Sequence, residues 1–148
     1  MKKICITVIA LCAVYFYTAG NNLNPDGDSI ELITAGFCNG IPHSPGYPVF
    51  VRLLNSAITM FSGFLTVPAS CYLINNILSG LNLILIGHII FGLCCLKSEN
   101  ALCKKNGLNK NLKIMSAFFA LLYISFSRTY WTESISAEVY ILHILAIT

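Results

Sequence analysis

The feature that most constrains this chain is an apolar run from Cys71 to Leu96 that contains no charged residue. A helix needs about 20 predominantly apolar residues to cross the hydrocarbon core of a bilayer, so this run is long enough to span one. Similar runs occupy 4–20 and 112–128, and a fourth covers 138–148. Only 10% of the residues are charged, against about 25% in soluble domains. The sequence therefore predicts an all-α integral membrane protein.

The fourth run is too short to complete a crossing. At 1.5 Å per residue, a helix from Glu138 to Thr148 rises about 16 Å, which is roughly half of a hydrocarbon core. We therefore expect this chain to be the N-terminal part of a longer protein, with its last span truncated.

The first run, 4–20, has two interpretations. It follows two lysines at 2–3, and the small residues at 18–20 would suit cleavage of a secretory signal peptide. It is also long enough to approach a first spanning helix. Bulky aromatic residues at 15–17 favour the spanning helix, because aromatic side chains concentrate at the membrane–water interface. Both interpretations remain open.

The distribution of charge predicts the topology. Five lysines and one glutamate lie between 97 and 113, and cytoplasmic loops carry an excess of lysine and arginine. We therefore place the N-terminus and this loop in the cytoplasm, and 21–69 and 129–137 on the extracytoplasmic side of an inner, plasma or endoplasmic-reticulum membrane. Apolar runs separate the lysines, so they form no basic stripe for nucleic acid.

The long extracytoplasmic loop, 21–69, is expected to open with a turn at 24–27 and to contain two short helices. Residues 29–38 form the first, with Asp28 at its N-cap and Glu31 three residues later in a capping-box arrangement. Residues 39–40, Asn-Gly, would end it. After a proline-rich segment, 49–62 has the periodicity of an amphipathic helix, which either lies in the membrane interface or packs on neighbouring protein.

Cofactor and metal motifs are absent from the sequence. Seven cysteines occur without a CxxC pair or a Cys/His ligand spacing, so we interpret them as small apolar packing residues. No nucleotide-binding glycine-rich loop is present. No cofactor is expected, although a divalent ion at the acidic residues of the first loop stays open.

Three stretches carry a resemblance to a known family. Residues 27–35 read Gly-Asp-Ser-Ile-Glu-Leu-Ile-Thr-Ala, residues 42–48 read Pro-His-Ser-Pro-Gly-Tyr-Pro, and Trp131 precedes Ser-Ile-Ser-Ala-Glu-Val-Tyr at 134–140. Together they resemble the N-terminal part of the protein O-mannosyltransferase family typified by transmembrane protein 260. Two positions depart from its usual pattern, with Ile30 in place of glycine and Ser44 in place of proline.

The resemblance implies a multispanning helical bundle similar to the GT-C glycosyltransferases. It implies transfer of a sugar, expected to be mannose, from a polyprenyl-phosphate carrier to a hydroxyl of a protein or glycan acceptor at the outer surface of the bilayer. The family runs to several hundred residues, so the activity is expected of the full-length protein.

The resemblance places the acidic motif at Asp28, which is our candidate for the base that removes the acceptor hydroxyl's proton. Glu31 lies three residues on, on the same helical face, where it would orient the acceptor or bind a metal. His43 and Tyr47 are candidate contacts for the donor phosphate or the acceptor. A helix cap is the structural alternative for the first two residues, and a loop held by backbone hydrogen bonds is the alternative for the third.

Two further candidates flank the third run. Arg128 suits a phosphate through charge-assisted hydrogen bonds, or it extends to lipid headgroups. Glu138 begins the fourth run, where a charge is costly without a partner, so we expect it at the site with Arg128 as its partner across a brief polar return at 133–137.

Two other classes of function compete with a glycosyltransferase. A transporter or lipid flippase would show charges deep within spans or paired broken helices, whereas here the charges lie at the ends of the spans. A non-catalytic membrane scaffold is the third class, and it predicts that Asp28→Asn leaves function intact.

Overall fold

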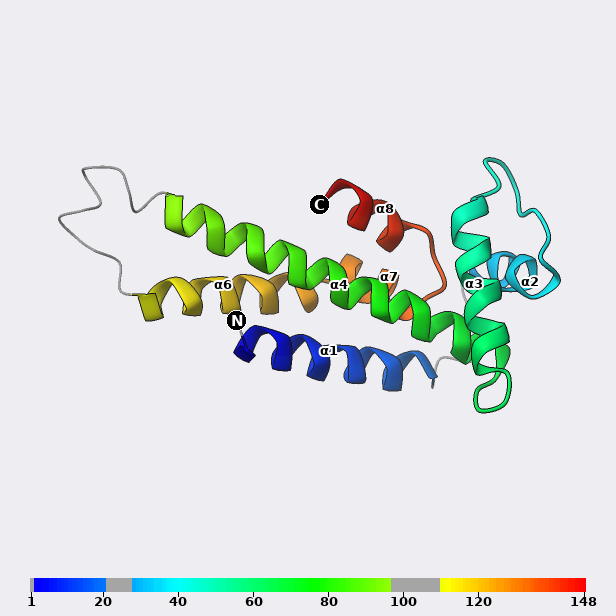
Figure 1. The fold of residues 1–148 in the computed structure, drawn as a ribbon, viewed down its shortest axis with the longest axis horizontal. Helices are drawn as coiled ribbons and strands as arrows, with labels where there is room; N and C mark the ends of the chain where they lie inside the picture. Colours follow the sequence, from blue (N-terminus) through cyan, green and yellow to red (C-terminus); the bar gives the residue numbers. More distant parts are fainter. Residues whose placement is uncertain (1, 21–27, 97–109) are drawn as a thin grey trace.

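The computed structural model describes residues 2–20, 28–96 and 110–148, and these residues form helices without strands. Three long helices run side by side along the molecule, and two shorter ones lie across one end (Figure 1). The expected all-helical class is confirmed. The helices are α1 (Lys2–Gly20), α2 (Ser29–Cys38), α3 (Pro48–Phe61), α4 (Val67–Leu96), α6 (Lys110–Ser125), α7 (Arg128–Ile135) and α8 (Tyr140–Ile147).

Helix α4 is the centre of the fold, because it contacts every other helix of the described segments. Its stretch Val67–Leu93 has a mean hydropathy of 1.8 and, within the described part of the chain, is the one helix long and apolar enough to cross a membrane. The expected spans at 4–20 and 112–128 are helical, but their apolar stretches are shorter, at Ile6–Ala19 and Ile114–Ser125. The multispanning arrangement therefore stays a prediction.

The asparagine side chains of α4 face other helices, as polar groups within apolar helices usually do, whereas His88 is exposed. Asn75, Asn76 and Asn82 are at most 2% exposed. The Asn75 Nδ2 donates to the carbonyl oxygens of Glu133 and Ser136, each at 2.7 Å. This side chain therefore ties the end of α7 to α4.

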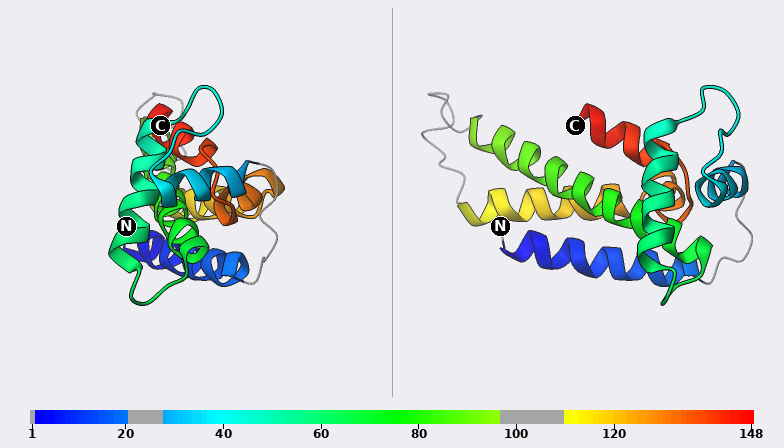
Figure 2. Two further views of the ribbon diagram at one scale, coloured as in Figure 1. Left: turned by 90° about the vertical axis from the view of Figure 1, so that its right-hand side faces the viewer. Right: turned by 45° about the vertical axis from the view of Figure 1, so that its right-hand side comes forward.

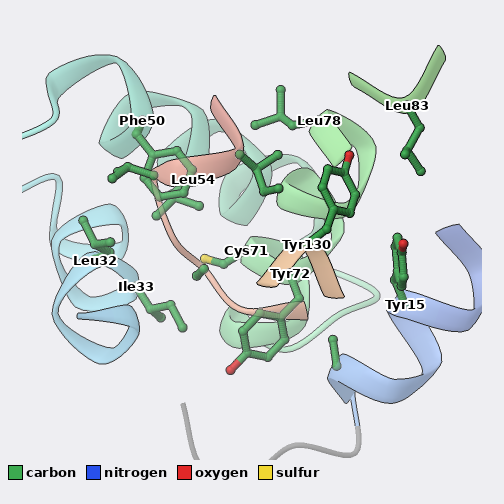
Figure 3. Packing of buried hydrophobic residues seen from close by; sticks show 14 of the residues in the cluster. Tyr15, Leu32, Ile33, Phe50, Leu54, Cys71, Tyr72, Leu78, Leu83 and Tyr130 are labelled. Atoms are coloured by element: carbon green, nitrogen blue, oxygen red, sulfur yellow. The ribbon is translucent and has the colours of Figure 1, made fainter. Parts of the chain in front are cut away.

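Helix α1 is an integral part of the bundle. Tyr15 is fully buried (Figure 3), and its hydroxyl donates to the Ser125 carbonyl of α6 at 2.7 Å. Its ring also meets Trp131 of α7 edge-on, with 5.0 Å between ring centroids. One side chain of α1 therefore contacts both α6 and α7.

Helices α2 and α3 pack against each other at the end of the bundle (Figure 2). They confirm the helices expected at 29–38 and 49–62. The apolar face of α3, including Phe50 and Leu54, is buried against α2 and α4, which supports packing on neighbouring protein. The close approach depends on Gly36 of α2, because a Cβ there would lie 2.7 Å from the Leu54 Cβ.

The polar return expected at 133–137 is wrong, because most of this segment belongs to helix α7. Ser127 caps the helix by accepting a hydrogen bond from the Tyr130 amide, and the buried Tyr130 hydroxyl donates to the Ser79 carbonyl of α4. The turn expected at 24–27 and most of the basic loop at 97–113 lie outside the described residues.

Candidate functional site

Three of the expected site residues meet where α2 begins. The Glu31 carboxylate receives two contacts from His43: the backbone amide donates to Oε1, and Nδ1 lies 2.9 Å from Oε2. The other ring nitrogen of His43, Nε2, lies 3.6 Å from Oδ2 of Asp28. These side chains are between 39% and 56% exposed, so the cluster is open to solvent and to a substrate.

The His43 contacts shift the protonation of both partners in opposite directions. The hydrogen bond and charge of His43 lower the pKa of the Glu31 carboxyl, and the same bond to Glu31 raises the pKa of His43. The negative charges of Asp28 and Glu138 raise the His43 pKa further. The two side chains are therefore held as a hydrogen-bonded ion pair over part of the acidic pH range.

The expected reciprocal cap of α2 does not form. Asp28 occupies the N-cap position, but its backbone is in the right-handed helical region and its side chain makes no capping hydrogen bond. An N-cap residue normally needs an extended backbone to turn its side chain onto the helix. Glu31 reaches His43 rather than the N-cap amide, so both carboxylates face the loop. Asn39, with φ of 53°, ends the helix as expected.

A second contact brings Glu138 to the start of α2. The Oγ of Ser29, a residue that is fully buried, donates to Oε1 of Glu138 at 2.9 Å, across 109 positions of sequence. Burial raises the pKa of the Glu138 carboxyl, and the charges of Asp28 and Glu133 raise it further. Glu138 lies before the start of α8, in the segment that follows α7.

Tyr47 links the cluster to α8. Its backbone is left-handed, with φ of 39°, a conformation that costs free energy in a residue other than glycine and that often occurs at functional sites. Its ring lies 5.8 Å from that of His43 and 6.2 Å from that of His143, between centroids. It also lines a cavity of about 470 Å³ between the start of α3 and α8, together with Phe50, Val139, Leu142 and Ala146.

The expected pair of Arg128 and Glu138 is wrong. Within the described segments, the ion pairs join His43 to its two carboxylates, and Glu138 is instead bound by Ser29. The reason is α7, which separates the two residues by a helix of 8 residues that rises about 12 Å. Arg128 is exposed at the start of α7, apart from the contacts that form the cluster.

The carboxylate and imidazole groups of the cluster can accept and donate protons. Three of them also lie close enough together to be considered as metal ligands. Asp28, Glu31 and His43 each offer a ligand atom within 4.8 Å of the others. Both Glu31 oxygens and the His43 Nδ1 are, however, engaged with each other, so we assign no ion to this cluster. Asp28 keeps the most exposed side chain of the three.

The N-terminal domain described as that of protein O-mannosyl-transferase TMEM260 matches residues 28–148. This match begins at Asp28 and includes all of α2 to α8. The chain belongs to the TMEM260 protein O-mannosyl-transferase family.

A curated TMEM260 relative agrees with this assignment. The mouse (Mus musculus) protein named "Protein O-mannosyl-transferase TMEM260" is 32% identical over 134 residues, which cover 90% of this chain and 16% of the mouse protein. The chain therefore spans about one sixth of the length of that relative. No solved structure matches it.

Two residues that contact the candidate site residues were not predicted from the sequence. Ser29 follows Asp28 in the family motif, so its position next to an acidic residue was the available signal. His143 lies three residues after Tyr140, one turn further along the same helix, and gave no signal of its own. The Ser29 contact depends on the placement of the segment between α7 and α8 beside α2, and the His143 contact on the placement of α8 beside Tyr47; no local pattern encodes either.

Proposed function

We propose that the full-length protein is a membrane glycosyltransferase that moves a sugar, mannose, from a polyprenyl-phosphate carrier to a hydroxyl of a protein or glycan. The name of the mouse relative supports O-mannosyl transfer. The observation that carries the proposal is the meeting of the Asp28 and Glu31 carboxyl groups at one imidazole, that of His43.

Asp28 and Glu31 are the catalytic residues of this proposal. The acceptor hydroxyl loses its proton to a carboxylate as its oxygen attacks the anomeric carbon. The bond from that carbon to the phosphate oxygen breaks, and its electron pair leaves with the phosphate, which needs no acid. Asp28 has the exposure to meet an incoming hydroxyl, whereas Glu31 is oriented by His43.

The apolar cavity beside Tyr47 supports the proposal of a substrate that carries an apolar part next to its polar one. Its volume of about 470 Å³ falls in the range of roughly 300–1,000 Å³ that is typical of small-molecule sites. Tyr47 would contact the substrate in the cavity, and His43, whose ring lies 5.8 Å from that of Tyr47 between centroids, would contact it beside the cavity. Arg128, on its exposed turn, would serve the carrier phosphate or the lipid headgroups.

The membrane arrangement is part of the same proposal. The long apolar helix α4 supports insertion in a bilayer. The N-terminus and the basic segment 97–113 would lie in the cytoplasm, and the carboxylates on the opposite side, at the level of the carrier's headgroup. Several spans, as in a GT-C-like bundle, would hold them there.

The test is transfer of labelled mannose from polyprenyl-phosphate mannose by the full-length protein in membranes. We expect Asp28→Asn and Glu31→Gln each to lower the rate about 100-fold or more, the range for removal of a general base. Glu99→Gln, in the basic segment expected on the opposite side, is the matched control. An arm with EDTA reports any need for a divalent ion. Undiminished transfer in both site variants would remove the catalytic assignment and favour a scaffold.

A further inference from the structure

One face of α8 and the start of α3 form the walls of the cavity beside Tyr47. The residues that α8 contributes have the helical spacing of three and four positions that places side chains on one face: Val139, Leu142, His143 and Ala146. The opposite wall comes from the proline-rich loop and the first residues of α3, namely Pro45, Tyr47, Pro48, Val49 and Phe50. The polar groups among these residues are the Tyr47 hydroxyl and the His143 ring, so the cavity suits an apolar group with polar neighbours at its edge.

Two backbone hydrogen bonds hold this cavity close to the Asp28 carboxylate. The Gly46 amide donates to the His43 carbonyl at 2.8 Å, and the Val51 amide donates to the Tyr47 carbonyl at 3.0 Å. These bonds anchor both ends of the segment that keeps the Tyr47 ring 5.8 Å from the His43 ring, between centroids. Asp28 Oδ2 lies 3.6 Å from Nε2 of the same imidazole. One imidazole therefore separates the proposed base from the wall of the cavity.

The charge of the neighbouring cluster favours a neutral occupant. Two carboxyl groups, those of Asp28 and Glu31, face one imidazole. The hydrogen bond and charge of His43 lower the pKa of Glu31, so its carboxylate is ionised at neutral pH. A phosphate at this edge of the cavity would meet charge of its own sign, which is costly. A guanidinium that would attract phosphate, that of Arg52, lines a neighbouring groove and not the cavity. The cavity therefore suits a peptide, whose backbone is neutral, better than the phosphate-bearing carrier.

We propose that this cavity is the subsite for an apolar side chain of a polypeptide acceptor, two positions from the serine or threonine that receives the sugar. The inference rests on the proposed sugar transfer and names the part of the acceptor that the cavity recognises. An extended peptide turns side chains i and i+2 to the same side and rises about 3.4 Å per residue, so these side chains lie roughly 7 Å apart. When the hydroxyl meets Asp28, the second side chain lies across the His43 ring, at Tyr47 and the cavity.

Burial in the cavity gives a preference among acceptors. Moving one leucine side chain out of water favours binding by about 10- to 100-fold. The contacts would come from the α8 wall, where Ala146 is the smallest lining residue and Leu142 lies one turn before it. The sizes of these two residues should therefore set the size of the acceptor side chain that fits.

The test measures kcat/KM of the full-length protein for synthetic peptides that contain one threonine, with polyprenyl-phosphate mannose as the donor. We expect leucine two positions from the threonine, on one of its two sides, to give a kcat/KM about 10- to 100-fold above that of alanine at the same position. Leucine directly next to the threonine points to the opposite side and should give no such advantage. Equal kcat/KM for all of these peptides would overturn the inference.

Substitutions in α8 assign the preference to the cavity. Ala146→Phe fills the space and should bring the ratio between the leucine and alanine peptides close to one. Leu142→Ala enlarges the space and should shift the preference toward phenylalanine. Ile147→Phe is the matched control and should keep the wild-type ratio, because this side chain is 87% exposed and does not line the cavity.

The ratio between two peptides does not depend on the amount of folded protein, so either cavity variant can decide the matter. A wild-type ratio in every cavity variant that transfers sugar would contradict the subsite. A KM that rises for the donor, with the peptide ratio unchanged, would instead place the carrier's tail in the cavity and would also overturn the inference.

A binding measurement needs no turnover and therefore separates this inference from the proposed function. The anisotropy of the same peptides, labelled with a fluorophore and titrated with purified full-length protein, should show about 10- to 100-fold tighter binding of the leucine peptide. Ala146→Phe should remove this difference. A difference in binding without transfer of mannose would support the subsite and refute the proposed function. Transfer of mannose without a difference in binding would refute the subsite and leave the proposed function in place.

Discussion

Replacing Gly36 by alanine should drive α2 and α3 apart. The new Cβ would lie 2.7 Å from the Leu54 Cβ, an atom next to the backbone that no change of rotamer can move, and 3.7 Å from the Asn55 amide nitrogen. Ordinary contact begins at 3.4 Å, so the helices must separate locally by roughly 0.7 Å. Overpacking of this kind costs about 1–3 kcal/mol.

The higher helix propensity of alanine stabilises the Gly36→Ala protein and so offsets part of this packing cost. Alanine is favoured over glycine in a helix interior by about 1 kcal/mol, which would hide part of the loss. Gly92→Ala measures that gain alone, because Gly92 lies in α4 and a Cβ added there would meet no neighbouring atom within 4 Å. The difference in stability between the two variants should therefore equal the packing cost of about 1–3 kcal/mol.

Thermal unfolding in detergent can measure this difference through labelling of the buried Cys71 thiol by a fluorogenic maleimide. At about 2–4 °C per kcal/mol for a chain of this size, the midpoint of Gly36→Ala should lie roughly 6 °C below that of Gly92→Ala. Sugar transfer should fall too, because α2 carries Glu31. A Gly36→Ala protein as stable as the control would refute the close approach of the two helices.

Three further predictions concern α1 and the His43 loop. Tyr15→Phe leaves the Ser125 carbonyl without its buried side-chain donor and should cost about 1–3 kcal/mol in the same unfolding assay. The mature protein should retain 1–20, because α1 is packed in the bundle; a mass that lacks this segment would contradict it. Hydrogen-exchange protection of the loop should be greatest between pH 4.5 and 6.5, the ordinary pKa values of Glu31 and His43. It should be lost as pH rises through the raised pKa of His43 or falls through the lowered pKa of Glu31, and flat protection would refute the ion pair.

Local patterns predicted the helices well because the signals were themselves local. The turn residues at 39–40 ended α2 at Cys38 as expected, and the apolar periodicity of 49–62 located α3 within one residue at each end. The asparagines of α4 are buried against protein, since an amide such as Asn75 is costly against lipid.

Long-range contacts could not be predicted in this way. Glu31 had a local partner available in the capping box, and only the fold shows that a histidine 12 residues away takes both its oxygens. The polar composition of 133–137 suggested a turn, whereas the burial of Tyr130 against α4 stabilises a helix there. Because α7 separates Arg128 from Glu138, the wrong prediction for 133–137 also led to the wrong prediction that these two residues pair.

The double hydrogen bond of Asn75 makes the corner between α7 and α8 move as one piece with α4. Glu138 lies two residues beyond the bound Ser136 carbonyl, whereas its partner Ser29 belongs to α2. Helix α2 also contacts α4, so both partners of the Ser29–Glu138 hydrogen bond lie on segments that pack against this one helix. Because a long apolar helix adjusts its tilt to the thickness of the surrounding bilayer, a change of lipid composition that tilts α4 would act on both sides of this contact.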